Sequence, residues 1–294
     1  MEKAIVYFTK DISAKGLVKI YEKLNSDLEG NVAVKISTGE LGGHNYLKPE
    51  LIKDLVNKLN GTIVECNTAY KGKRFSNQDH LETIKAHGFD KIADVDIMDS
   101  EGEISIPVRM GKHLKENYVG KNLSNYNSML MLSHFKGHAM GGYGGALKNM
   151  SIGIASSEGK AFIHTSGKTK DVNIMWDNLS KQDDFLESMA EACLSVIDYM
   201  NKKILYINVM NNLSVDCDCS SNPEDPCMKD IGILASIDPV AIDEACLDLI
   251  YNSTDIGRDH FVERVERQNG RYLPVYAEKL GLGTHNYELI SIDE

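Results

Sequence analysis

The stretch VAVKISTGELGGHNYLKPELIKDLVNKLNGTIVEC, residues 32–66, indicates the fold class. Its two ends, 32–36 and 62–66, are short runs rich in β-branched residues, which are typical of buried strands. Between them, residues 48–60 place leucine and isoleucine on one face of a helix, with Pro49 in the first turn. A strand, a helix and a second strand in succession predict a parallel pair joined by a crossover helix.

The same alternation continues on both sides of this stretch. Further strands are predicted at 4–8, 128–134, 204–210, 231–237 and 287–292, and further helices at 77–87, 183–201 and 239–251. We therefore predict an α/β fold with mostly parallel sheets flanked by helices and with two lobes. We expect one domain, residues 1–294, whose lobes 1–110 and 125–294 meet at a polar stretch, 111–127.

Some local details are predicted as well. Asp11 is expected to cap the first helix. Two short β-like runs, 95–98 and 104–108, are expected to form a hairpin or an excursion at the edge of the sheet. Asp238 is expected to cap the helix that begins with a proline, and Asp243 is expected to add surface charge to that helix.

The chain has 294 residues and a formal net charge of −11 at pH 7. Nonspecific binding to nucleic acid or to an anionic membrane is disfavoured, because like charges repel. No apolar run approaches the roughly 18 residues that span a bilayer, and the N-terminus lacks the pattern of a secretory signal. We expect a cytoplasmic protein with no nucleic-acid or membrane partner. Of the six cysteines, Cys193 and Cys246 fall in apolar helical patterns and are expected in the core.

Residues 133–164, SHFKGHAMGGYGGALKNMSIGIASSEGKAFIH, carry the strongest functional signal. Four glycines, Gly141, Gly142, Gly144 and Gly145, follow a predicted strand, and glycine lets the backbone approach a ligand closely. Such a turn at the carboxyl end of a parallel strand is where α/β sheets bind small molecules. The spacing fits neither GxGxxG nor GxxxxGK[ST], so neither a dinucleotide nor a nucleoside triphosphate is predicted.

Three histidines, His134, His138 and His164, bracket this turn, and Lys148 lies in an otherwise apolar stretch. Imidazole titrates near neutral pH and ligates transition metals, so we predict a metal-dependent site here. The lysine is either part of a salt bridge or a reactive amine whose pKa burial has lowered. The alternative is a set of surface or hydrogen-bonded histidines that bind nothing.

A second cluster, VDCDCSSNPEDPC at 215–227, contains Asp216, Cys217, Asp218, Cys219 and Cys227. Thiolates and carboxylates at this density suit zinc or iron, with Cys66 or a histidine as a further ligand. The alternative is an acidic, turn-rich loop without a metal.

A small basic loop, AYKGKRFSNQDH at 69–80, contains Lys73 and Arg74. These two side chains are candidates for holding an anionic group of a substrate. The alternative is a solvated loop that binds nothing.

Several motifs together resemble one bacterial and archaeal family, and they cover nearly the whole chain. They are GELGGHNYLKPELI (39–52), ECNTAYKGKRFSNQDHLETIKAHGF (65–89), the glycine segment (133–160), VDCDC (215–219) and DIGILASIDPVAIDEACLDL (230–249). The family is the domain of unknown function 362, often labelled "uncharacterised Fe-S center protein". Many members carry an inserted ferredoxin module with two C-x-x-C-x-x-C-x-x-x-C-P runs. This chain has no such run, so the resemblance implies the family fold without that module.

HAMGGYGGALK (138–148), with a histidine downstream, is also similar to the core motif of the nickel-pincer lactate racemases, H-x-x-x-G-[YF]-x-G-G-x-K. Ala146 stands where the last glycine of that motif would be. The resemblance implies that His138 transfers protons, that Lys148 carries a covalently attached nickel cofactor and that His164 ligates the nickel. It provides no counterpart for a second catalytic histidine or for the N-terminal Arg-Pro substrate motif, and His134 and His44 are candidates to substitute.

The first interpretation is thus a metal-dependent enzyme of racemase, epimerase or oxidoreductase type. It would act on a small hydroxy-acid-like metabolite by metal-assisted proton or hydride transfer, with nickel, iron or zinc as the metal. One alternative is an iron–sulfur protein that uses Cys217, Cys219 and Cys227 for electron transfer with a redox partner protein. The other is a non-catalytic binding subunit.

Overall fold

Strand β7 (Ser128–His134) lies at the centre of the fold, and all seven residues of its sequence SMLMLSH are buried. It pairs in parallel with β2 (Val32–Lys35) on one side and with β10 (Ile204–Met210) on the other. β10 is also buried along its whole length. Strands that are apolar on both faces require cover on both faces. The computed structural model describes residues 3–293.

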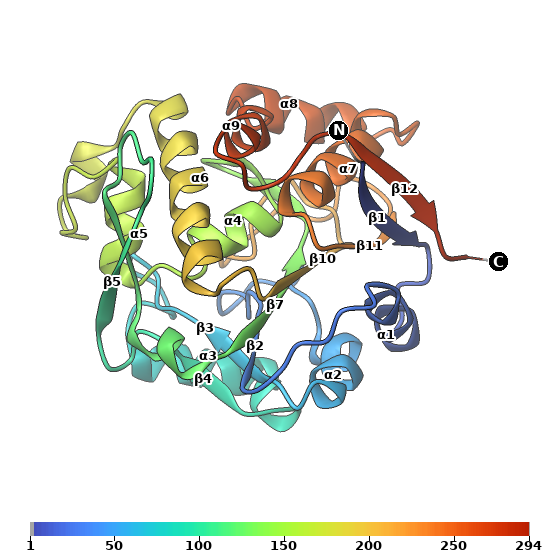
Figure 1. Ribbon diagram of the computed structural model, residues 1–294, viewed down its shortest axis with the longest axis horizontal. Helices are drawn as coiled ribbons and strands as arrows, with labels where there is room; N and C mark the ends of the chain where they lie inside the picture. Colours follow the sequence, from blue (N-terminus) through green and yellow to red (C-terminus); the bar gives the residue numbers. More distant parts are fainter. Residues whose placement is uncertain (1–2, 294) are drawn as a thin grey trace.

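The main sheet contains eight strands in the order β12-β1-β11-β10-β7-β2-β3-β4 (Figure 1). The strands not yet named are β1 (Ala4–Thr9), β3 (Thr62–Glu65), β4 (Val95–Ile97), β11 (Gly232–Ser236) and β12 (Tyr287–Ser291). Five of the seven neighbouring pairs are parallel, and β11 makes both antiparallel pairs. The predicted α/β class is confirmed. Both predicted lobes contribute strands to this one sheet.

Helices cover the two faces of the sheet as separate layers (Figure 1). One layer contains α1 (Ala14–Lys23), α2 (Pro49–Lys58) and α3 (Asn77–His87). The other contains α4 (Ala146–Ser151), α5 (Ser157–His164), α6 (Gln182–Tyr199), α7 (Pro239–Tyr251), α8 (Arg258–Arg267) and α9 (Tyr272–Lys279). Cys193 and Cys246 are fully buried in this second layer, as predicted. Within residues 3–293, no helix combines the length and the apolar character needed to cross a bilayer.

Two short hairpins lie outside the main sheet. They are β5 (Glu103–Pro107) with β6 (Glu116–Gly120), and β8 (Lys136–His138) with β9 (Gly142–Gly144). Of the two alternatives for 95–98 and 104–108, the hairpin is wrong, and β4 lies at the edge of the main sheet. β4 pairs with β3 in the main sheet, and β5 finds its partner in the polar stretch 111–127.

The predicted helix caps are partly corrected. Asp238 caps α7 as expected, by accepting hydrogen bonds from the backbone of Val240 and Ala241. The predicted Asp11 cap is wrong, because α1 begins at Ala14 and the preceding Ser13 accepts the hydrogen bond from Gly16 N.

Asp243 is not a surface charge, as expected from the sequence, but is completely buried. Its carboxylate accepts hydrogen bonds from the first two backbone N–H groups of α4, those of Ala146 (2.7 Å) and Leu147 (3.0 Å). Asn208 Nδ2 and the Tyr143 hydroxyl also donate to it, at 2.8 and 3.3 Å. Burial raises the pKa of Asp243 to about 6 although these four donors oppose the shift. α4 is six residues long and depends on this remote cap.

Gly137 in β8 allows the hairpin to touch the loop that follows β10. Its N–H donates to Ser214 O at 2.8 Å, and a Cβ at this position would lie 2.3 Å from Val215 O. We predict that Gly137→Ala lowers the free energy of unfolding by about 1–3 kcal/mol, because backbone atoms would have to move apart. Gly144→Ala in β9 is the matched control, since a Cβ there meets only flexible lysine carbons at 3.5 Å. Urea unfolding measures both, and equal effects would contradict the prediction.

Candidate functional site

A cavity of about 460 Å³ opens where β2, β3, β7 and β10 end. These four strands run in the same direction, so their carboxyl ends meet at one edge of the sheet. Ligands of α/β sheets bind at such an edge, and the volume suits a small metabolite. The lining includes His138, Lys148 and His164.

His138 is 8% exposed, and the glycine turn determines which of its ring nitrogens carries the proton. Nδ1 accepts hydrogen bonds from Gly141 N at 2.8 Å and Met140 N at 3.2 Å. Because Nδ1 is the acceptor, the hydrogen-bond network assigns the proton to Nε2. Burial lowers the pKa of His138, and the nearby Lys148 lowers it further. The residue is therefore a neutral imidazole whose N–H faces the Cys217 sulfur and donates a hydrogen bond to it.

His164, the last residue of α5, has the opposite arrangement. Its Nδ1 donates to Lys160 O at 2.7 Å, which leaves a lone pair on Nε2. The ring stacks on Phe185 with 4.7 Å between the ring centroids. Burial lowers the pKa of His164 to about 4. A neutral imidazole anchored through one nitrogen, with the other free, is the usual state of a histidine that ligates a metal.

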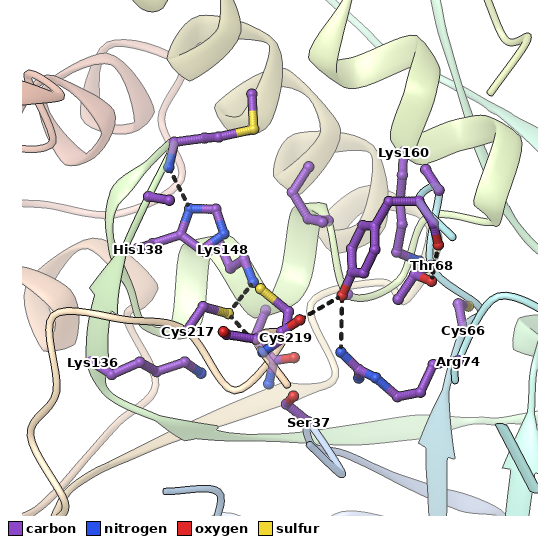
Figure 2. A pocket seen from close by; sticks show the side chains of 18 of the residues that line it. Ser37, Cys66, Thr68, Arg74, Lys136, His138, Lys148, Lys160, Cys217 and Cys219 are labelled. Atoms are coloured by element: carbon purple, nitrogen blue, oxygen red, sulfur yellow. Dashed lines mark hydrogen bonds between the residues drawn. The ribbon is translucent and has the colours of Figure 1, made fainter. Parts of the chain in front are cut away.

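Cys217, Cys219 and Lys148 meet His138 on one side of the cavity (Figure 2). A ring nitrogen of His138 and the two sulfurs all lie within 4.8 Å of one another. Lys148 Nζ lies 3.5 Å from Cys217 Sγ, and the backbone N–H of Cys219 donates to the same sulfur at 3.4 Å.

The two thiols of this group titrate very differently. Hydrogen bonding to Cys219 and the charge of Lys148 hold the pKa of Cys217 well below its usual value in spite of burial. The pKa of Cys219 is raised well above its usual value, first by its hydrogen bond to Cys217 and then by burial. Although burial opposes it, the thiolate charge raises the pKa of Lys148. Cys217 and Lys148 are therefore a thiolate–ammonium pair.

Asp218, between the two cysteines, fixes this loop to the main sheet. Its carboxylate lies 2.8 Å from His134 Nδ1 and 2.9 Å from Lys136 Nζ, and all three side chains are buried. His134 Nε2 lies 2.6 Å from Asn211 O, so both ring nitrogens face oxygen acceptors. His134 lines the cavity, but both of its ring nitrogens already have partners, so neither is free to contact a metal or a substrate.

The basic residues predicted to hold an anion differ in their placement. Arg74 lines the cavity, but its guanidinium is paired with Glu65 at 3.2 Å and Glu40 at 3.6 Å. The Lys73 ammonium is largely exposed, and its partner is Asp79 at 3.4 Å.

The predicted glycines and the remaining cysteines are also dispersed. Gly145 lines the cavity, Gly141 donates to His138, and Gly142 and Gly144 form β9. Gly142 has a φ of +80°, which suits glycine and lets the turn close. The lining also includes Cys66. Cys227 lies outside the lining, and its thiol donates to Leu213 O at 3.3 Å.

Lys136 and Lys160 were not predicted as site residues, and Asp218 was predicted as a possible metal ligand in the second cluster; all three are buried. Lys136 and Lys160 line the cavity, and Asp218 holds the loop that contributes Cys217 and Cys219. The available signal was the pattern C-D-C, in which a carboxylate between two thiols requires a buried cation to balance it.

A second group, His113, Asp184 and Glu187, could also hold a metal by distance alone. Here the oxygens of Glu187 already accept from Lys112 Nζ and the Tyr272 hydroxyl, each at 2.7 Å. Because the oxygens of Glu187 already have these partners, we interpret the group as a cluster of ion pairs and hydrogen bonds rather than as a metal site.

Asp218→Asn tests the anchor of the cysteine loop. We predict a loss of about 3–5 kcal/mol in the free energy of unfolding at pH 7, because Lys136 would remain buried without its partner. Burial raises the pKa of Asp218, but His134 and Lys136 outweigh it and hold the pKa at about 2, below the usual 3.8. The stabilisation is therefore present above pH 3.8 and is lost as the pH falls towards 2.

Urea unfolding from pH 7 to pH 3 should show the difference between wild type and Asp218→Asn narrowing at the acid end. Asp225→Asn is the control in the same loop, since its side chain is 92% exposed. A difference that stays constant over this pH range would contradict the assignment.

Comparison with known proteins finds a family and a distant structural likeness. The family described as domain of unknown function (DUF362) matches residues 32–248. No curated protein matches the chain. The lactate racemase apoprotein from Thermoanaerobacterium thermosaccharolyticum matches with 15% identity and a TM-score of 0.43, over 86% of this chain and 58% of that one. A protein from Thermotoga maritima matches with 12% identity and a TM-score of 0.37, over 90% and 58%. The chain therefore spans less than two thirds of either protein.

Proposed function

This chain belongs to the DUF362 family, whose function is unknown, and from that premise we propose that it is a metal-dependent enzyme. Its substrate would be a small hydroxy-acid-like metabolite, and its reaction a proton or hydride transfer. The observation that carries the proposal is the opposite protonation of two histidines in one cavity. His164 presents a lone pair, whereas His138 presents an N–H.

The residues of the cavity fit a bound transition metal. The Nε2 lone pair of His164 is free, and Cys217 is a thiolate without a hydrogen on its sulfur. Imidazole and thiolate together suit nickel, iron or zinc. We therefore assign the metal to His164 with Cys217 and Cys219. The two sulfurs lie within 4.8 Å of a ring nitrogen of His138 but not both within that distance of His164, so the His164 ring and the thiols would have to approach one another on binding. When bound, such a metal supplies Lewis-acid chemistry at a substrate oxygen.

The other two residues act on the substrate directly. His138 holds a proton at Nε2 and donates it in a hydrogen bond to the Cys217 sulfur. Once that sulfur is ligated, the neutral imidazole with its lowered pKa can instead polarise a substrate oxygen by donating the hydrogen bond to it. The Lys148 ammonium adds a fixed positive charge beside it, which favours developing negative charge. His138 is a poor metal ligand in this geometry, because coordination through Nε2 would require the proton to leave while Nδ1 still accepts from Gly141.

One observation favours an iron–sulfur protein as the second candidate: the sulfurs of Cys217 and Cys219 meet in the cavity, and cysteine sulfur is the usual ligand of such clusters. An iron–sulfur cluster that also used Cys227 would need that thiol to turn from Leu213 O towards the cavity. A non-catalytic binding subunit would keep the cavity without needing a metal.

Metal content separates these functions. We predict about one metal ion per chain in protein purified without oxygen from its native host. His164→Gln and Cys217→Ser should each lower the metal content at least about tenfold, since each removes a ligand. Cys227→Ser is the control and should retain the metal. Elemental analysis measures all four proteins, and the peptide mass of Lys148 tests whether it carries a cofactor.

Each outcome has a defined meaning. Metal-free wild type with an unmodified Lys148 would refute the metal-dependent enzyme and favour the binding subunit. Acid-labile sulfide, together with loss of iron in Cys227→Ser, would favour the electron-transfer protein.

A further inference from the structure

Lys160 is a buried cation to which the proposed chemistry assigns no role. It lies on α5 and is only 7% exposed, yet it lines the cavity. Its ammonium donates to Ala155 O at 2.6 Å. An ammonium has three N–H donors, so two remain for a ligand. Figure 2 shows Lys160 and Thr68 across the cavity from His138 and Lys136.

Lys160 differs from the other cations of the cavity because it lacks an anionic partner. The others are paired: Lys35 and Arg74 with Glu65 (3.0 and 3.2 Å), Lys136 with Asp218 (2.9 Å), and Lys148 with the Cys217 thiolate (3.5 Å). Within residues 3–293, no carboxylate lies within 4.0 Å of Lys160 Nζ. Burial lowers the pKa of Lys160, although the more distant charges of Asp99 and Glu65 oppose the shift, so its charge is costly and an anionic ligand beside it would be favoured.

The position of Lys160 on its helix connects it to the proposed metal ligand. Lys160 and His164 are four residues apart on α5, so they project from the same face as neighbours. The hydrogen bond from His164 Nδ1 to Lys160 O joins the two residues as well. A small molecule could therefore contact the ammonium at one end and the region of His164 Nε2 at the other.

We propose that Lys160 binds the carboxylate of the substrate and that the substrate class is a small α-hydroxy or α-oxo carboxylate. The carboxylate pairs with Lys160, and the adjacent oxygen faces His164 and His138. The contact between the adjacent oxygen and the two histidines rests on the proposed function. The pairing of the carboxylate with Lys160 does not. It assigns anion binding to Lys160 rather than to Lys73 or Arg74, which already have carboxylate partners.

Binding of named probes tests the assignment without requiring turnover. Glycolate and lactate are titrated calorimetrically into wild type, Lys160→Met and Lys160→Arg, with lactamide and propane-1,2-diol as uncharged probes. Lys160→Met keeps the length of the side chain and removes the charge, so carboxylate affinity should fall at least about tenfold. Lys160→Arg should retain most of it. Lys73→Met is the matched control, with its ammonium outside the cavity, and should bind as wild type does.

Unchanged carboxylate affinity in Lys160→Met would overturn the proposal, as would wild type that binds neither carboxylate or binds lactamide equally well. A protection experiment on wild type needs no variant. Glycolate should slow acetylation of Lys160, read by peptide mass, but not that of Lys73. Equal protection of both would also overturn the proposal. Metal content is measured on the same samples. Absence of a metal would contradict the proposed function, whereas unchanged carboxylate affinity in Lys160→Met would contradict the role of Lys160, so the two results are distinguishable.

Discussion

The ion pairs of Asp218 are the contacts on which the candidate site depends most. One carboxylate, placed between Cys217 and Cys219, joins their loop to His134 at the end of β7 and to Lys136 in β8. All three groups are removed from water, so none can lose its partner cheaply. Arg264 also holds this loop, through Val215 O at 2.6 Å and Asp216 at 3.1 Å, but Asp218 is the anchor that lies between the two thiols. Asp218 therefore positions Cys217 and Cys219 in the cavity without needing to contact the substrate itself.

The fold class was predictable from sequence because the alternation of buried strands and amphipathic helices is a local signal. The bounds of α3, β7 and β10 follow directly from it. The reversal of β11 and the existence of α4 were not predictable. Each depends on a partner far away in the chain, β1 and β10 for the strand and Asp243 for the helix.

The same distinction applies to the candidate site. His138, Lys148 and His164 could be selected from their spacing around a glycine turn, and all three line one cavity. Their protonation could not be inferred from spacing. It follows from which backbone group each ring nitrogen meets, Gly141 N for His138 and Lys160 O for His164. Lys160 was overlooked because a lone lysine in a helix looks like surface charge until its burial is known.

The position of β1 also has a consequence for how quickly the chain can reach its native state. β1 is among the first segments of the chain, yet its neighbours in the sheet are β11 and β12, with Tyr7 paired to Ala235 and Ile290. Pairings between residues so distant in sequence close very large loops and slow folding. We therefore expect a high contact order, with this edge of the sheet forming late and the β2–β3–β7 region, built from nearer segments, forming first.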